Sequence, residues 1–217
     1  MSQASSFLVI LLHGVGSNGA NMLSLADAWR ANFPDVQFIA PDGIMAGPQG
    51  FGRAWFSIDG VTDTNRPQRI EASRTAFDDM MKDIIAKAGF EQKLDRIVFV
   101  GFSQCTMMAL DAVVSGRWPI AAVLAYSGRL ATRLPYHAVK TRIRLIHGDA
   151  DPVIPVNETR KADDILREIG FDVETTILPR VPHMISAEGV ELGCIFLESI
   201  TKRQDGPDGI GRSRDAL

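Results

Sequence analysis

Arg96-Ile-Val-Phe-Val-Gly-Phe-Ser-Gln-Cys-Thr106 is the stretch of sequence that decides the fold. The four apolar residues 97–100 predict a fully buried strand, and the apolar positions of residues 107–113 predict a helix soon after it. Between them lies Gly-x-Ser-x-small, centred on Ser103, which in this setting is typical of a nucleophile held at a sharp, strained turn. The plainer alternative is a Gly-Ser turn that joins a strand to a helix without any chemistry. The flanking strand and helix favour the nucleophile, because a helix N-terminus stabilises developing negative charge.

Strands and helices alternate along the rest of the chain. Apolar runs predict further strands at residues 7–12, 36–40, 120–126, 143–146 and 171–178. Helical periodicity predicts a helix that starts after Asn21 or Ser24 and ends at residue 33, and further helices at 70–88, 156–169 and 185–201. This order predicts an α/β fold: a doubly wound, mostly parallel sheet of about six or seven strands with helices on both faces. We expect a single domain at residues 1–203 and a frayed tail at 204–217, which is rich in Gly, Asp and Arg.

Composition excludes several classes of function. The chain has 217 residues, a net charge of −3 and no basic cluster interleaved with aromatic residues, so nucleic acid is not an expected partner. Its two cysteines lie far apart, which predicts neither a disulfide framework nor a zinc site. The apolar run at residues 7–12 is too short to span a membrane and has no basic residue before it, so we expect no membrane insertion and a cytoplasmic location.

Chemically capable residues follow the ends of the predicted strands. In a parallel sheet these ends share one edge, where ligands bind, so residues remote in sequence meet there. Serine needs a base within hydrogen-bond reach, and the base needs a carboxylate. The chain order serine, acid, histidine favours Ser103 as nucleophile, Asp151 as acid and His183 as base. Asp149 is a second candidate acid, although a role in capping the turn suits it better. A metal site at His147, Asp149 and Asp151 is a weaker alternative, and we predict no metal.

A tetrahedral intermediate also needs hydrogen-bond donors for its oxyanion. Two backbone N–H groups are candidates: that of Gln104, directly after the serine, and that of Val15, in the glycine-rich loop after the first strand. Each such donor stabilises the transition state by roughly 3–4 kcal/mol where this has been tested. Gly14 and Gly16 allow the loop to approach a substrate closely.

Five segments together carry a resemblance to a known family. They are Leu11-Leu12-His13-Gly14-Val15-Gly16, Arg53-Ala54-Trp55-Phe56, Gly101-Phe102-Ser103-Gln104, His147-Gly148-Asp149-Ala150-Asp151-Pro152-Val153-Ile154-Pro155 and Pro182-His183-Met184-Ile185-Ser186. From about residue 7 to 200 the chain resembles the phospholipase/carboxylesterase family of α/β-hydrolases, which includes the acyl-protein thioesterases. The resemblance implies a serine esterase without a cofactor or a large cap domain. It also implies Ser103, Asp151 and His183 as the catalytic triad, with the Val15 and Gln104 amides as the oxyanion hole.

The chain departs from the family pattern at two places. Two glycines normally follow the position of Gln104, where this chain has Cys105 and Thr106, and a glycine normally stands where it has Pro182. Cys105 is either a small buried residue or the cause of a distorted elbow with weak catalysis. Apolar residues beside the predicted strand ends suggest an acyl groove, which we expect to include Met22, Trp55, Phe56, Val153 and Met184, with Met45 nearby.

The expected function is that of a carboxylesterase. It would hydrolyse esters or thioesters of short to medium acyl groups through an acyl-enzyme, with a small-molecule or lipid acyl ester as substrate and a homodimer as one possible assembly. The alternative is a catalytically weak or inactive protein of the same fold that binds a small ligand, because fold alone does not fix function. Cys105 as the nucleophile is a third, disfavoured reading, and no lid suited to bulk fat is visible.

Overall fold

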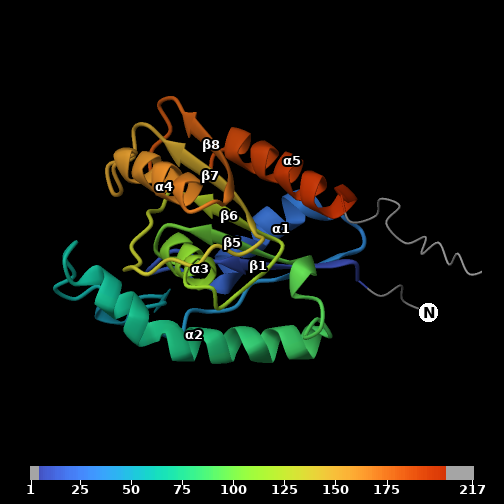
Figure 1. Cartoon of the computed structure of the whole chain (residues 1–217), viewed down its shortest axis with the longest axis horizontal. Coiled ribbons are helices and arrows are strands. Elements are labelled where there is room, and N and C mark those ends of the chain that lie inside the picture. Colours follow the sequence, from blue (N-terminus) through green and yellow to red (C-terminus); the bar gives the residue numbers. More distant parts are fainter. Residues whose placement is uncertain (1–4, 204–217) are drawn as a thin grey trace, which may run out of the picture.

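The computed structural model describes residues 5–203. Its central sheet has six strands in the order β2-β1-β5-β6-β7-β8, and every neighbouring pair is parallel (Figure 1). These strands are β1 (Phe7–Leu12), β2 (Val36–Ile39), β5 (Ile97–Phe102), β6 (Ala122–Tyr126), β7 (Arg142–Gly148) and β8 (Asp172–Leu178). The predicted fold class is therefore confirmed.

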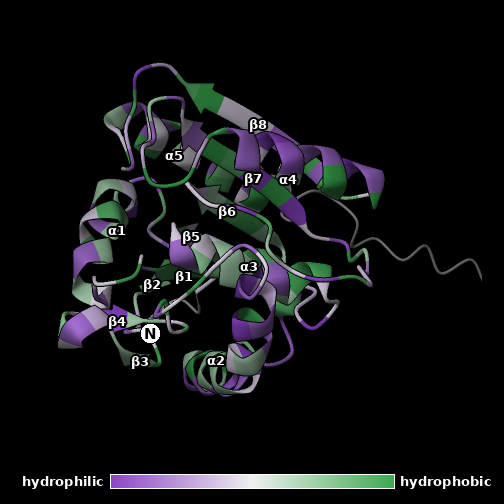
Figure 2. Cartoon of the chain, turned by 90° about the vertical axis from the view of Figure 1, so that its left-hand side faces the viewer, coloured by the Kyte–Doolittle hydropathy of each residue, from purple (hydrophilic) through white to green (hydrophobic). Residues whose placement is uncertain are grey.

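Helices cover both faces of the sheet, as Figure 2 shows. The five α-helices of the described residues are α1 (Leu23–Arg30), α2 (Arg66–Ala88), α3 (Gln104–Val114), α4 (Asn157–Glu168) and α5 (Ala187–Arg203). On β1, Leu8, Ile10 and Leu12 pack in one core cluster with α2, α3 and α4. The alternate residues Phe7, Val9 and Leu11 pack in a second cluster with α1 and α5. All six residues of β1 are buried because the strand is covered on both faces.

The longest connection lies between β2 and α2. It contains a small antiparallel hairpin of β3 (Met45–Ala46) and β4 (Arg53–Ala54), and Arg53 also pairs with Ser17 in an isolated bridge. Two-residue strands are too short to leave a pattern in the sequence, so the strand predictions do not include them. Within residues 5–203 this connection is the largest excursion from the sheet, and no large cap domain covers the site.

The residues at the two ends of α2 explain where this helix begins and ends. Helix α2 has Pro67 in its first turn and ends at Gly89, whose φ of 77° closes the helix, while the next residue, Phe90, packs into the core.

None of the helices within residues 5–203 combines the length and the apolar character needed to cross a bilayer. The predicted tail at 204–217 lies outside the described residues.

Candidate active site

Ser103 stands between β5 and α3 in a conformation that L-residues rarely adopt. Its φ is 56° and its ψ is −113°, and its N–H donates to the carbonyl of Tyr126 on the neighbouring strand at 3.0 Å. Such backbone geometry costs about 1–3 kcal/mol and persists only where the surroundings impose it. The serine is therefore held at a strained elbow, as the sequence pattern predicts.

Gly101 and Gly128 make this elbow possible. A Cβ on Gly101 would lie 2.8 Å from the backbone nitrogen of Thr106, and one on Gly128 would lie 2.2 Å from the Thr106 methyl carbon. The Thr106 hydroxyl lies 2.9 Å from the Gly101 carbonyl and 2.8 Å from that of Tyr126, so it can donate to either. The close approach of helix and strand thus depends on Gly101 and Gly128, with Thr106 fitted between them.

His183 reaches Ser103 from the loop after β8. Its Nε2 lies 2.9 Å from Ser103 Oγ, and its Nδ1 lies 2.6 Å from Asp151 Oδ2. The ring is packed against that of Phe102, with 4.9 Å between centroids. The structure therefore brings the three residues predicted as a triad into one hydrogen-bonded chain. Pro182 does not prevent this, because it lies on the surface and its carbonyl accepts the N–H of Met184 at 2.8 Å.

Asp151 accepts hydrogen bonds on both oxygens. Oδ1 accepts the N–H groups of Val153 at 2.8 Å and Ile154 at 2.9 Å, while Oδ2 lies near His183 Nδ1 and, at 3.0 Å, His147 Nε2. Burial by itself would raise the pKa of this carboxyl, but the hydrogen bonds from His183, Ile154 and Val153 outweigh it, so the pKa lies below its ordinary value. Asp151 is therefore an ionised carboxylate in a fixed orientation.

His147, which the sequence analysis considers only as part of a metal site, lies beside Asp151 and next to the triad. It is fully buried, and its Nδ1 lies 2.6 Å from the Thr159 hydroxyl while its Nε2 also lies 2.9 Å from the Ile154 carbonyl. Burial lowers the pKa of His147, so the ring is neutral near pH 7. Its position four residues before Asp151 was a weak signal, because the intervening turn had to be known to bring the two side chains together.

Asp149 has the structural role that its position in the turn predicts. Its Oδ1 accepts the N–H of Arg180, which has a φ of 60° in the loop after β8. Among the residues that the structure describes, no group of three or more His, Cys, Asp or Glu side chains is arranged to hold a metal ion.

The two candidate oxyanion donors lie on either side of the elbow. Gln104 is the first residue of α3, so its N–H is not used within the helix. The loop after β1 lies directly against the serine, because a Cβ on Gly14 would be 3.0 Å from the Phe102 ring and 3.3 Å from Ser103 Cβ. Gly16 in the same loop has a φ of 77°, and its N–H donates to the Arg53 carbonyl at 2.9 Å. Val15 lies between these two glycines.

Comparison with known proteins places the chain in a family. The sequence model of the Phospholipase/Carboxylesterase family matches residues 2–200. The chain belongs to this family. Esterase YpfH of Escherichia coli K12 is 29% identical over 184 residues, covering 85% of this chain and 78% of that protein. Acyl-protein thioesterase 1 of Neurospora crassa is 30% identical over 203 residues, covering 84% and 82%. The crystal structure of esterase PE8 has 32% identity and a TM-score of 0.83, covering 92% of this chain and 94% of that one. The chain is thus a carboxylic ester hydrolase with the α/β-hydrolase fold.

A cavity of about 400 Å³ opens beside His183 in this hydrolase. Its apolar walls come from five places: the loop after β1, the residues around the start of α1, the end of β5, the loop after β8 and the first turn of α5. The residues are Val15, Met22, Leu25, Phe102, Met184, Ile185 and Val190. Two of the predicted groove residues, Met22 and Met184, therefore line it. The other three do not: Val153 is 61% exposed outside the cavity, and Trp55 and Phe56 are buried in the core. The Trp55 indole packs on the Phe77 ring, which a loop position in the sequence does not reveal.

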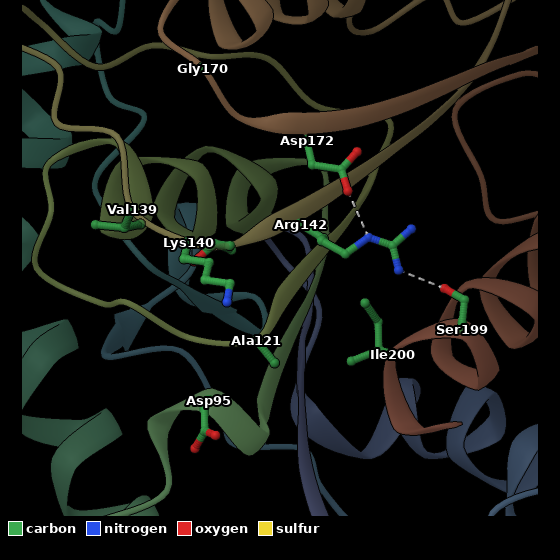
Figure 3. A pocket seen from close by; sticks show the side chains of 10 residues that line it. Asp95, Ala121, Val139, Lys140, Arg142, Gly170, Asp172, Ser199 and Ile200 are labelled. Carbon is green, nitrogen blue, oxygen red and sulfur yellow. Dashed lines mark hydrogen bonds and ion pairs between the residues drawn. The ribbon is translucent and has the colours of Figure 1, made fainter. Parts of the chain in front are cut away.

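A larger cavity, of about 530 Å³, lies where β7 and β8 begin, and Figure 3 shows the side chains that line it. Arg142 and Asp172, at the start of β7 and β8, line it and bond to each other at 3.0 Å. Arg142 also donates to Ser199 at 3.0 Å. This cavity is remote from the carboxyl ends of the strands, and its arginine is already paired.

Cys105 is fully buried in the core cluster that includes α2, α3 and α4. Burial raises the pKa of its thiol well above the ordinary value, so the thiol is protonated at neutral pH. A buried, protonated thiol is a poor nucleophile, which argues against the reading of Cys105 as the attacking group.

Proposed function

We propose that this family member is a serine esterase that hydrolyses carboxylic esters or thioesters of short to medium acyl groups through an acyl-enzyme. One observation carries the proposal: Ser103, on a strained elbow, is hydrogen-bonded to His183, which is hydrogen-bonded to the ionised Asp151. This is the arrangement that makes a serine hydroxyl nucleophilic at neutral pH.

Acylation begins with attack by Ser103 Oγ on the carbonyl carbon of the substrate. His183 Nε2 takes the hydroxyl proton, and Asp151 stabilises the imidazolium that results. The carbonyl oxygen becomes an oxyanion that accepts the N–H groups of Gln104 and Val15. When the intermediate collapses, His183 returns its proton to the departing alcohol or thiol, and the acyl group stays on Oγ.

Deacylation repeats these steps with water. His183 removes a proton from the water molecule as it attacks the acyl carbonyl, and then protonates Ser103 Oγ as the carboxylic acid leaves. Because Asp151 is anchored by the amides of Val153 and Ile154, the histidine keeps its orientation through both half-reactions.

The cavity beside His183 is our candidate for the acyl site. Its walls are mostly apolar and its volume, about 400 Å³, lies near the lower end of the range of small-molecule sites, roughly 300–1,000 Å³. These properties favour a short to medium acyl chain. The names of the relatives, an esterase and an acyl-protein thioesterase, support both oxygen esters and thioesters as substrate classes.

The test is hydrolysis of a chain-length series of p-nitrophenyl esters and matching thioesters by the wild type, Ser103→Ala and Ser73→Ala. Loss of the nucleophile should lower kcat by about 10⁴-fold or more, whereas Ser73→Ala, on α2 away from the site, should match the wild type. A fluorophosphonate should label the wild type at Ser103. A folded wild type that hydrolyses none of these compounds would instead support the alternative of a ligand-binding protein.

A further inference from the structure

A segment at residues 53–56, formed by β4 and the two aromatic residues after it, has no part in the proposed chemistry. This segment nevertheless contacts both halves of the candidate oxyanion hole. We propose that Trp55 and the side chain of Gln104 form a brace that positions the two oxyanion donors relative to each other. This inference rests on the proposed function. Trp55 and Gln104 are then positioning residues in addition to the main-chain role of Gln104.

The first half of the brace joins α3 to the segment. The side chain of Gln104 is buried, its Oε1 accepts the N–H of Trp55 at 2.9 Å, and its Nε2 donates to the carbonyl of Phe56 at 2.7 Å. Both ends of the amide are therefore hydrogen-bonded to the backbone, one to Trp55 and the other to Phe56. The residue whose N–H is the first oxyanion donor is thus anchored through its own side chain.

The second half joins the segment to the loop after β1. Trp55 Nε1 donates to the carbonyl of His13 at 2.8 Å, two residues before Val15. On the other side of Val15, the N–H of Gly16 donates to the Arg53 carbonyl, and the Arg53 N–H donates to the Ser17 carbonyl at 2.7 Å. The segment therefore fixes the chain both before and after the second donor.

His13 adds control over the donor peptide itself. The Gly14 carbonyl and the Val15 N–H belong to the same planar peptide group. His13 Nδ1 lies 2.7 Å from that carbonyl, and its Nε2 accepts the N–H of Gly43 at 2.9 Å, which places the ring proton on Nδ1. The imidazole therefore donates to the Gly14 carbonyl, which sets the plane of the peptide and polarises the Val15 N–H.

Burial makes the brace rigid. Trp55 is fully buried, with its ring 5.4 Å from that of His13 and 5.8 Å from that of Phe77. No water can replace a lost partner in such a place without rearrangement, so removing one hydrogen bond leaves an unpaired group. Oxyanion donors need placement to within about 0.5 Å, and a brace that spans both of them supplies it.

The experiment compares Trp55→Phe with Trp118→Phe. Both tryptophans are buried, and each donates its indole N–H, Trp118 to Asp78 at 2.6 Å. Trp118 lies near the C-terminal end of α3 and packs on the Phe99 ring. Trp55→Phe keeps an aromatic ring and removes the bond to the His13 carbonyl. We expect kcat for p-nitrophenyl butyrate to fall about 10- to 100-fold with KM changed less than about threefold. Trp118→Phe should lose comparable stability with kcat unchanged within about twofold.

An inhibitor pair separates positioning from a general loss of structure. A trifluoromethyl ketone forms a tetrahedral adduct whose oxyanion needs the donors. The matching methyl ketone forms much less of this adduct, so its binding depends little on the donors. In Trp55→Phe the affinity for the trifluoromethyl ketone should fall in parallel with kcat, and the affinity for the methyl ketone should stay at the wild-type value. Gln104→Met, which keeps the main-chain amide, should give the same split.

Either of two results would overturn the brace: wild-type kcat in a folded Trp55→Phe or Gln104→Met, or equal losses of kcat in Trp55→Phe and Trp118→Phe. Failure of the proposed function would look different. In that case the folded wild type would hydrolyse none of the esters, or Ser103→Ala would keep the wild-type rate, whatever the two tryptophan variants do.

Discussion

Replacing Cys105 by glycine gives the chain the residue that the resemblance described in the sequence analysis leads us to expect at this position, and it tests whether the elbow is distorted. In the structure the Cys105 side chain is fully buried, and the close approach of α3 to β5 is made at Gly101. The thiol therefore fills space in the core instead of forcing the helix away from the strand. We expect Cys105→Gly to lose stability and to gain no activity.

The expected loss can be worked out from the buried atoms. Removing Cβ and Sγ forfeits roughly 0.8 kcal/mol for each buried heavy-atom group, and the small cavity that remains adds to this. Glycine costs about 0.4 kcal/mol more than cysteine within a helix. The sum is about 2–3 kcal/mol, which lowers Tm by about 5–10 °C in a domain of this size.

The assay pairs urea unfolding with kcat/KM for p-nitrophenyl butyrate, and Cys194→Ala on α5 serves as the control because Cys194 is partly exposed. Cys105→Gly should keep kcat/KM within about twofold of the wild type, and the control should unfold within about 0.5 kcal/mol of it. A tenfold gain in kcat/KM, equal to about 1.4 kcal/mol of barrier, would refute this reasoning and establish that Cys105 distorts the elbow.

Two further predictions concern stability. Burial lowers the pKa of His13 and of His147 below the value of 6.5 that they have in the unfolded chain, so the unfolded state binds more protons below that pH. The free energy of unfolding should therefore fall as the pH decreases from 7 to 5, by at most about 1.4 kcal/mol per pH unit for each histidine. The measurement is the free energy of unfolding from urea titrations between pH 7 and 5, and a value that does not change with pH would contradict the lowered pKa values. The control is His137→Gln, at an exposed position, which should leave this pH dependence unchanged. Asp111 is fully buried and paired with Arg74 and Arg117. Asp111→Asn should therefore lower the free energy of unfolding in urea by about 3 kcal/mol. The control Asp79→Asn, at an exposed position, should lower it by less than about 0.5 kcal/mol. Equal midpoints for these two variants would show that the buried pairs add nothing.

The sequence predicts the sheet and the serine, aspartate and histidine of the site because both leave strong local signals. Apolar runs covered on both faces indicate parallel strands, and such strands bring their carboxyl ends together, so residues 103, 151 and 183 are expected to meet. That inference needs no knowledge of any side-chain contact.

The lining of the cavity could not be predicted in the same way. An apolar residue in a loop can face a pocket or the core, and nothing near Trp55 distinguishes the two. Its place in the core depends on Phe77 and His13, which are distant in sequence. The roles of His147 and Asp111 could not be predicted for a related reason, because a buried polar residue is explained only by partners that the fold supplies, such as Thr159 or Arg74.

Because β8 lies at an edge of the sheet, the residues of the site differ in how easily the strands that carry them unfold locally. Ser103 and Gln104 follow a central strand, whereas His183 follows β8, one of the two edge strands. The loop after β8 is held by the hydrogen bonds of the Arg180 N–H to Asp149 and of the Ala150 N–H to the Val181 carbonyl. Edge strands open at a lower free energy than central ones. When β8 separates from β7, Ser103 stays in place but loses its hydrogen bond with His183. We therefore expect the proposed activity to be lost when β8 separates from β7, at a lower free energy than that needed to unfold the centre of the sheet.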